Sequence, residues 1–311
     1  MQRITSISGD ITMKKLTAIL LTVLMVASML TLVGCKQKPA DELIPDAIEK
    51  TSELDAFDID YKIAVDASVM GMGMEVPGSG KIQVAGIDDI DDLELYASFE
   101  VDLSDMESML SSMGAGGEFD DPIEGEIAYS DGWLYVKYNA MGEEGEAKSD
   151  VSDYIDDFAD ELKGMDMDDV MDQMPAEATA MIDEFKDMFE ELLEDADVER
   201  DGGNRVVELK IDTDDINDMI GGVMSIIGYA ADLDLPGLSV EKLNSTITVN
   251  RKEYIVGFDT EIEVSMDMQG VAFDMEASIE FTLNNPGGKV KVSTIKGAKK
   301  FEEVEADDLL G

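Results

Sequence analysis

The chain has 311 residues, and its 71 Asp and Glu outnumber its 23 Lys and Arg to give a formal net charge of −48. A surface this acidic repels phosphates, so we expect no nucleic-acid partner. Histidine is absent, which excludes Ser-His-Asp and Cys-His catalysis and histidine-ligated zinc. Acid pairs are numerous, but the chain has only one tryptophan to stack a sugar, so glycosidase chemistry is not favoured. We expect no enzymatic activity, no cofactor and no resident metal.

The N-terminal residues have the pattern of a secretory signal. A short basic segment, Met13-Lys14-Lys15, precedes an apolar stretch at 16–32, and the only cysteine, Cys35, follows. An apolar stretch of about 17 residues is at the lower limit for a membrane-spanning helix. A single membrane helix with a buried thiol is therefore the alternative. Residues 1–12 lack signal character, which makes Met13 a candidate for the true start.

Leu32-Val33-Gly34-Cys35 resembles the lipobox of bacterial lipoproteins. The resemblance implies cleavage between Gly34 and Cys35 and a diacylglyceryl thioether on the Cys35 sulfur, which would also remove the only thiol nucleophile. We therefore expect residues 1–34 to be a signal peptide and residues 35–41 a lipidated tether. The membrane would be a partner through this anchor. The expected location is the extracytoplasmic face of the cell membrane of a bacterium, in particular a Gram-positive one.

Apolar spacing along the first half of the chain predicts one helix and then antiparallel strands. Residues 40–54 carry apolar side chains on one helical face, and a helix that starts near Ile44 would place Pro45 in its first turn. Strict alternation then predicts half-buried strands with one wet face, and Asp131-Gly132 is a two-residue hairpin signal. These strands are expected at 59–69, 82–84, 93–103, 123–129 and 134–138, with a turn at 77–80.

The middle of the chain is expected to be a helical insert at 150–230. Apolar residues recur at helical spacing up to residue 197, and Gly202-Gly203 ends this block before a strand at 207–211. A further helix at 214–229 is apolar on nearly all faces, which indicates that it is enclosed.

The chain closes with long alternating segments. Strands of 12 to 15 residues exceed the usual five or six, and strands that are apolar on one side must curve and wrap something. The expected fold is α+β: a curved antiparallel sheet, an open half-barrel of about eight or nine strands, that wraps the helical insert. We expect one domain at 42–300 and an acidic tail at 301–311. The closing strands are expected at 243–249, 254–268, 271–283 and 290–292.

This order of elements is similar to that of the LolA/LppX-type lipoprotein carriers. The features that carry the resemblance are the lipobox, a short first helix, a half-barrel sheet with a "YSDGWLYVKYN" hairpin at 129–139, a helical middle and closing strands. The resemblance implies a curved open sheet that cups several helices and leaves an apolar cavity for acyl chains.

Methionine is abundant, with 22 residues, and its flexible, polarisable side chain suits surfaces that accept varied apolar shapes. Alternation places Met70, Met72 and Met74 on one face of a strand. They could fill the core, line a ligand cavity or bind Cu(I), because soft thioethers select that ion. The candidates for lining a cavity are Met70, Met72, Met74, Phe99, Ile220, Met224, Phe258, Ile262, Met266, Phe273 and Met275.

Two functions from different classes fit these patterns. The first is a lipoprotein that binds or carries a hydrophobic, lipid-like ligand in an apolar cavity between sheet and helices. The alternative is a non-enzymatic surface interaction module, in which the core is filled and an acidic face binds a basic protein or a wall component. A surface cation buffer is a third option, although the acidic clusters at 88–92 and 166–169 lack the glycine and closing glutamate of an EF-hand loop.

Overall fold

The computed structural model describes residues 38–69, 72–106, 122–140, 142–157, 176–214, 216–217, 238–268 and 271–306. The expected signal peptide and Cys35 lie outside these residues. The helices whose full extent lies within these residues are α2 (Ala40–Ser52), η1 (Ile90–Asp92), α6 (Ala176–Asp195) and η2 (Ala298–Lys300). The strands are β1 (Ala56–Val69), β2 (Met72–Ala85), β3 (Glu94–Val101), β4 (Ile123–Ser130), β5 (Trp133–Ala140), β6 (Glu143–Asp150), β7 (Val198–Asp201), β8 (Asn204–Lys210), β9 (Leu238–Val249), β10 (Ile255–Met268), β11 (Val271–Asn284) and β12 (Glu302–Glu303).

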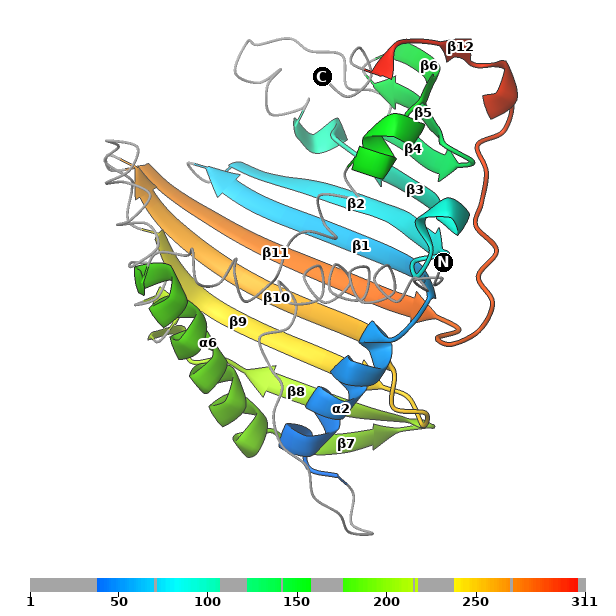
Figure 1. The fold of residues 1–311 in the computed structure, drawn as a ribbon. Coiled ribbons are helices and arrows are strands. Elements are labelled where there is room, and N and C mark those ends of the chain that lie inside the picture. The colour runs from blue at the N-terminus through cyan, green and yellow to red at the C-terminus, as the bar shows by residue number, and fades with distance from the viewer. Residues whose placement is uncertain are drawn as a thin grey trace, which may run out of the picture.

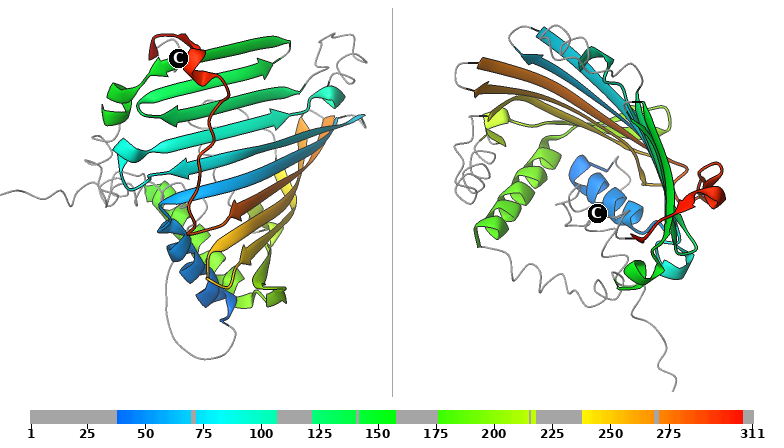
Figure 2. Two further views of the ribbon diagram at one scale, coloured as in Figure 1. Left: turned by 90° about the vertical axis from the view of Figure 1, so that its right-hand side faces the viewer. Right: turned by 90° about the horizontal axis from the view of Figure 1, so that it is seen from above.

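The described strands form one 12-stranded sheet in the order β12-β6-β5-β4-β3-β2-β1-β11-β10-β9-β8-β7. Neighbouring strands are antiparallel, except that β12 pairs with β6 in parallel. The sheet is open and strongly curved, and α2 and α6 lie on its concave side (Figures 1 and 2). We call the concave side the inner face and the convex side the outer face.

Long alternating strands give the sheet its two different faces. β1, β2, β10 and β11 have 14 residues each, which confirms the expected long strands. The inner face receives the odd-numbered residues of 57–67 in β1 and of 273–283 in β11, all of them apolar or aromatic. The intervening residues are mostly polar and lie on the outer face. Long twisted strands of this kind curve towards the side that they bury.

The largest core lies where α2 covers the inner face of β8 and β9. Leu43 and Ile44 of α2 are fully buried, as are Val207 of β8 and Val249 of β9, and α6 contributes the buried Leu193. These contacts join α2, the first helix among the described residues, to strands that lie more than 150 residues later in the sequence. The helix therefore depends on tertiary packing rather than on its own propensity.

The first predicted helix, at 40–54, is confirmed by α2. α2 begins at Ala40, and the Leu43 N–H donates to the Pro39 carbonyl over 2.9 Å. Pro45 therefore lies beyond the first turn and not within it, because the helix starts earlier than Ile44. The earlier start is explained by burial, because it places Leu43 in the same core as Ile44.

A segment that we call the strap, residues 285–301, crosses the outer face from β11 towards β12 (Figure 2). Its Ile295 and Phe301 are buried against Ala128 of β4, and the Ser293 N–H donates to Oε1 of Gln83 over 3.0 Å. The expected strand at 290–292 is wrong, because this segment runs across the strands instead of beside one. Beyond residue 300, where we expected the domain to end, β12 extends the sheet along β6.

Within the residues that the structure describes, there are more strands and fewer helical residues than expected. The expected count of eight or nine strands is too low because β7 has four residues and β6 has the weakly alternating sequence EEGEAKSD. The fold is mostly β rather than evenly α+β. Within the expected insert at 150–230, α6 is followed by the β7–β8 hairpin, which turns at Gly202-Gly203. The expected helix at 214–229 lies almost entirely outside the described residues.

An ion-pair cluster fixes the N-terminal end of the described chain. The Lys38 Nζ lies 2.6 Å from Oδ2 of Asp46 and 3.0 Å from Oε1 of Glu253, in the turn between β9 and β10. The Asp46 carboxylate is the main cause of a raised pKa at Lys38, and Lys38 in turn lowers the pKa of Glu253. Lys38 thus connects the start of α2 to the far side of the core.

We expect Glu253→Gln to lower the free energy of unfolding by about 0.5 kcal/mol at neutral pH, as for a partly exposed ion pair. The folded-state pKa of Glu253 lies below the unfolded value, so this contribution is present above the unfolded pKa of about 4.3 and is lost as pH falls through the lowered folded pKa. Urea unfolding at a series of pH values measures the difference, with the exposed Glu49→Gln as control. A difference between Glu253→Gln and the parent that persists in acid would contradict this assignment.

We expect Phe301→Ala to destabilise the fold by about 3 kcal/mol, because it leaves a cavity under the strap. Phe301 is 5% exposed, whereas its neighbour Lys300 is exposed and serves as the control Lys300→Ala. Thermal and urea unfolding would measure both variants. Equal stability of the two variants would show that the strap does not contribute to the fold.

Candidate ligand-binding face

A row of alternating aromatic and glycine residues crosses six strands on the inner face. Each member pairs directly with the next in the register of the sheet. At the β1 end the row continues into Phe281 of β11 and Phe258 of β10, whose ring centroids are 6.4 Å apart. We call the six residues from β6 to β1, without Phe281 and Phe258, the aromatic–glycine row. Its members, from β6 to β1, are Gly145, Tyr138, Gly125, Phe99, Gly80 and Tyr61.

The rings of this row lie along the sheet, over the neighbouring glycines. A Cβ on Gly125 would overlap the Phe99 ring, and one on Gly145 would overlap the Tyr138 ring. Tyr61 extends over Gly80, and its hydroxyl donates to the Ser98 carbonyl over 3.2 Å. Only glycine leaves the space that a flat ring needs here. For this reason the turn expected at 77–80 is wrong: these residues lie inside β2, where Gly80 accommodates Tyr61.

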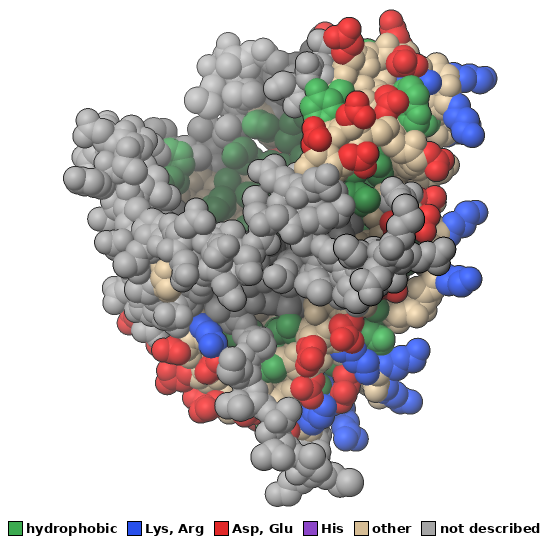
Figure 3. Space-filling view, viewed as in Figure 1, with side chains coloured by type: hydrophobic (Ala, Val, Ile, Leu, Met, Phe, Trp, Pro, Cys, Tyr) green, Lys and Arg blue, Asp and Glu red, His purple; other side chains and the backbone are tan. Residues whose placement is uncertain are grey.

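Large hydrophobic side chains around the row remain exposed. The exposed fraction is 46% for Tyr138, 39% for Phe99 and Met275, and 37% for Ile63 and Ile127. All five alternate onto the inner face. Hydrophobic side chains are visible in the hollow over β1 and β2 (Figure 3). An apolar surface of this kind marks a binding site more often than isolated exposed residues do.

No charged residue occupies the inner face of this half of the sheet. In β1 to β5 and in β11, every residue on that face is apolar, aromatic or glycine. Of the side chains described on that face, the only ones with polar groups are tyrosines. Such a surface can hold hydrocarbon, but it offers little to a charged substrate.

Methionines that are distant in sequence lie at the far end of the same face, away from α2. Met74 pairs with Ala67, which pairs with Met275 on its other side. In the next row, Phe273 pairs with Met266. Met72 lies in β2, whereas Met70, Ile220 and Met224 lie outside the described residues.

Two of the predicted cavity residues lie in packed regions instead. Phe258 packs against the core beneath α2, and Ile262 packs against the buried Val264 and Ile216. The inner face is therefore divided into a part filled by helices and a part with exposed apolar residues. The sequence analysis missed Tyr61, Tyr138 and the glycines of the row, because their relation appears only when the register of six strands is known.

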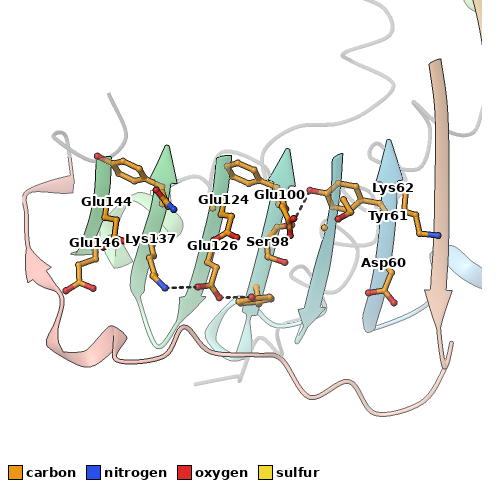
Figure 4. Close-up of a pocket in the computed structure, with 18 residues that line it drawn as sticks. Asp60, Tyr61, Lys62, Ser98, Glu100, Glu124, Glu126, Lys137, Glu144 and Glu146 are labelled. Carbon is orange, nitrogen blue, oxygen red and sulfur yellow. Dashed lines mark hydrogen bonds and ion pairs between the residues drawn. The ribbon is translucent and has the colours of Figure 1, made fainter. Parts of the chain in front are cut away.

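The outer face has a hollow of about 900 Å³ across β1 to β6 (Figure 4). Tyr96 donates to Oε1 of Glu126 over 2.8 Å, and the Nζ of Lys137 lies 3.6 Å from the same carboxylate. Burial raises the pKa of Tyr96, and Glu126 raises it further. Among the described residues, no three acidic or cysteine side chains are placed to hold a metal ion. The acidic residues that line the hollow are Asp60, Glu100, Glu124, Glu126, Glu144 and Glu146.

Comparisons with known proteins add a segment match and distant structural similarities. Residues 161–295 match the model of a family described as a family of unknown function (DUF6612). No curated protein matches the chain. Among the described residues, no helix has the length and hydrophobicity to cross a membrane.

Three solved structures can be aligned with most of the chain. The ywiB protein from Bacillus subtilis is 10% identical, with 76% of this chain and 94% of that chain covered and a TM-score of 0.18. A DUF1329 family protein from Desulfovibrio piger is 9% identical (83% and 96% covered, TM-score 0.21). DynF from the dynemicin biosynthesis pathway of Micromonospora chersina is 12% identical (86% and 94% covered, TM-score 0.20). TM-scores this low do not establish a common fold, and none of these proteins is named as a LolA/LppX-type carrier.

We expect Gly125→Ala to destabilise the protein by about 1–3 kcal/mol, because the added methyl group forces the Phe99 ring out of its position. The matched control is Gly73→Ala, since a Cβ there meets nothing within 4 Å. Urea unfolding of the two variants measures the difference. If Gly125→Ala were as stable as Gly73→Ala, the ring would not depend on the glycine.

Proposed function

We propose that this protein is a cell-surface lipoprotein that binds or carries a hydrophobic, lipid-like ligand on the inner face of β1 to β5 and β11. The observation that carries the proposal is the uncharged inner face with five exposed hydrophobic side chains around the aromatic–glycine row. The resemblance of the segment before Cys35 to a lipobox supports the membrane anchor and the extracytoplasmic location. The absence of histidine supports a binding role rather than catalysis.

The dimensions of the face support an acyl chain as the apolar part of the ligand. From Tyr61 to Ala67, the inner face of β1 extends over six residues, or roughly 20 Å at about 3.3 Å per residue. An acyl chain of one bilayer leaflet spans roughly 15 Å, half of a hydrocarbon core of about 30 Å. The strand is therefore long enough to contact one chain along its whole length. Flat aromatic rings and flexible methionines suit such a ligand, because neither demands a fixed shape.

A second candidate function is an interaction module that binds a basic partner on the outer face. It is favoured by the hollow on that face, where Glu100 lies directly opposite Glu124 in the register. Like charges in this position repel each other, and a cationic side chain between them would relieve the repulsion. Basic peptides or a cationic wall component would fit this site.

The first function is tested with a fluorescent fatty acid and with mass spectrometry of lipids extracted from the purified protein. We expect Ile127→Gln, on the inner face, to weaken fatty-acid binding roughly tenfold, because it removes most of one buried aliphatic contact. The matched control is Glu124→Gln on the same strand, whose side chain lies on the outer face, and unfolding curves would show that both variants fold.

The outcomes separate the two functions. Co-purified lipid and a loss of binding only in Ile127→Gln support the ligand-binding role. If no lipid is extracted and no fatty acid binds, the ligand-binding role is wrong. Salt-sensitive binding of a polylysine peptide that is lost in Glu124→Gln but kept in Ile127→Gln would support the interaction module instead.

A further inference from the structure

Three of the four arginines in the chain meet at one end of the sheet. Arg200 of β7 lies directly opposite Arg205 of β8. The guanidinium of Arg205 is 3.5 Å from both the Asn250 carbonyl and Oε1 of Glu253. Arg251, in the turn between β9 and β10, packs against Gly203 in the turn between β7 and β8, where a Cβ would lie 3.0 Å from its Nε. Two turns that are distant in sequence thus bring the arginines together.

Basic residues are scarce in a chain with a net charge of −48, and they gather in two places: the strap, which has only lysines, and this end, which has the arginines. Lys38 and Lys252 belong to the same end, and we call the five residues Lys38, Arg200, Arg205, Arg251 and Lys252 the basic end. Lys and Arg side chains gather there, over the two turns at the lower right of Figure 3. Glu253 is shared by Lys38 and Arg205, while Arg200, Arg251 and Lys252 are exposed.

The arrangement points to a phosphate-bearing partner. Two arginines placed opposite each other in a sheet repel, which costs stability unless an anion binds them. Guanidinium groups bind phosphate oxygens through two parallel hydrogen bonds, and they are less strongly hydrated than ammonium groups. Apart from the strap, which carries five exposed lysines, the rest of the described surface is mostly acidic and would be repelled by the same partner, so only a few orientations of the domain are favoured.

The short tether between Cys35 and Lys38 indicates which phosphate groups lie closest to the basic end. Lys38 is held in place by its ion pairs with Asp46 and Glu253, and Cys35 precedes it by three residues. Three residues span at most about 11 Å in any conformation. The Cα of Cys35 therefore lies within about 11 Å of the Cα of Lys38. If Cys35 carries the diacylglyceryl group of the proposed lipoprotein, the glycerol is only the length of the cysteine side chain farther away. The headgroups around the anchor are then the closest phosphates.

We propose that the basic end docks on the phosphate headgroups of the membrane that holds the anchor, so that the strands point away from the bilayer. The inference rests on the lipidation in the proposed function, but not on a ligand for the inner face. The start of α2 and the turns that form the basic end lie together at the bottom of the view in Figure 1. The methionine-rich ends of β10 and β11 lie at the opposite ends of strands of 14 residues.

The test uses the full acylated protein in vesicles of phosphatidylcholine, with or without phosphatidylglycerol, that contain a headgroup-labelled quencher lipid. A fluorophore is attached to a single introduced cysteine, either Asp201→Cys beside the basic end or Asp274→Cys towards the far end of β11. We expect strong quenching at residue 201 and weak quenching at residue 274 when phosphatidylglycerol is present. High salt should reduce the difference, because it screens the attraction.

Charge variants then identify the residues responsible. In the triple variant Arg200→Gln, Arg251→Gln, Lys252→Gln, we expect about twofold less quenching at residue 201, because each lost cation removes its attraction to the anionic surface. The matched control removes three exposed lysines of the strap: Lys289→Gln, Lys291→Gln and Lys296→Gln. In this control we expect the same quenching of the fluorophore at residue 201 as in the parent.

Each outcome decides the proposal. Equal quenching at residues 201 and 274, or quenching at 201 that is indifferent to phosphatidylglycerol and to the arginine variant, would overturn it. An intact mass without the diacylglyceryl group would also overturn it, because the short tether would be lost. A failure of the fatty-acid assay leaves the quenching result unaffected, so ligand binding and docking are judged separately.

Discussion

The apolar inner face of four 14-residue strands is the constraint on which the rest of the structure depends. Because side chains alternate along a strand, one face of β2, β1, β11 and β10 is largely apolar and is stabilised by contacts that exclude water, and the twist of long strands makes the sheet curve around that face. Among the described residues, α2 and α6 fill the curve over β8 and β9. In the other half, over β1 to β6, the flat rings of the aromatic–glycine row cover the backbone of the neighbouring glycines. This packing explains how that half remains ordered while its hydrophobic side chains stay exposed.

The outer face is organised by a shortage of cations. With 71 acidic and 23 basic residues, a basic side chain is often placed between two carboxylates, each within 3.2 Å. On the outer face the pairs connect neighbouring strands, and the strap adds hydrophobic contacts across the same region. The fold tolerates its negative charge because lysines bridge pairs of carboxylates and because the remaining carboxylates are spread over a large sheet. Lys38 contacts Asp46 and Glu253, Lys81 contacts Asp58 and Asp60, and Lys242 contacts Glu261 and Glu263.

Local features of the fold could be predicted from the sequence, and features that depend on register could not. The long strands follow from alternation, and the Asp131-Gly132 hairpin follows from two residues that accept positive φ, here 51° and 80°. β6 could not be predicted, because its sequence EEGEAKSD has almost no apolar residues. It forms a strand by pairing with the edge of β5. Part of the candidate site, Phe99 and Met275, was predicted from strand pattern alone. The row and the basic end were not, since each joins residues from several strands or turns.

The position of the anchor determines how far each part of the apolar inner face lies from the membrane. Tyr61 lies five residues, and Phe281 three residues, from the strand ends near the basic end, whereas Met275 and Phe273 lie towards the opposite end of β11. Under the proposed docking, Tyr61 and Phe281 are then roughly 10–17 Å from the headgroups, and Met275 is roughly 20 Å farther out, at about 3.3 Å per residue. An acyl chain on β1 would lie along the direction in which chains leave a leaflet. Exchange of such a chain at the methionine-rich end would therefore involve a partner outside the membrane, whereas exchange at the row would involve the bilayer itself.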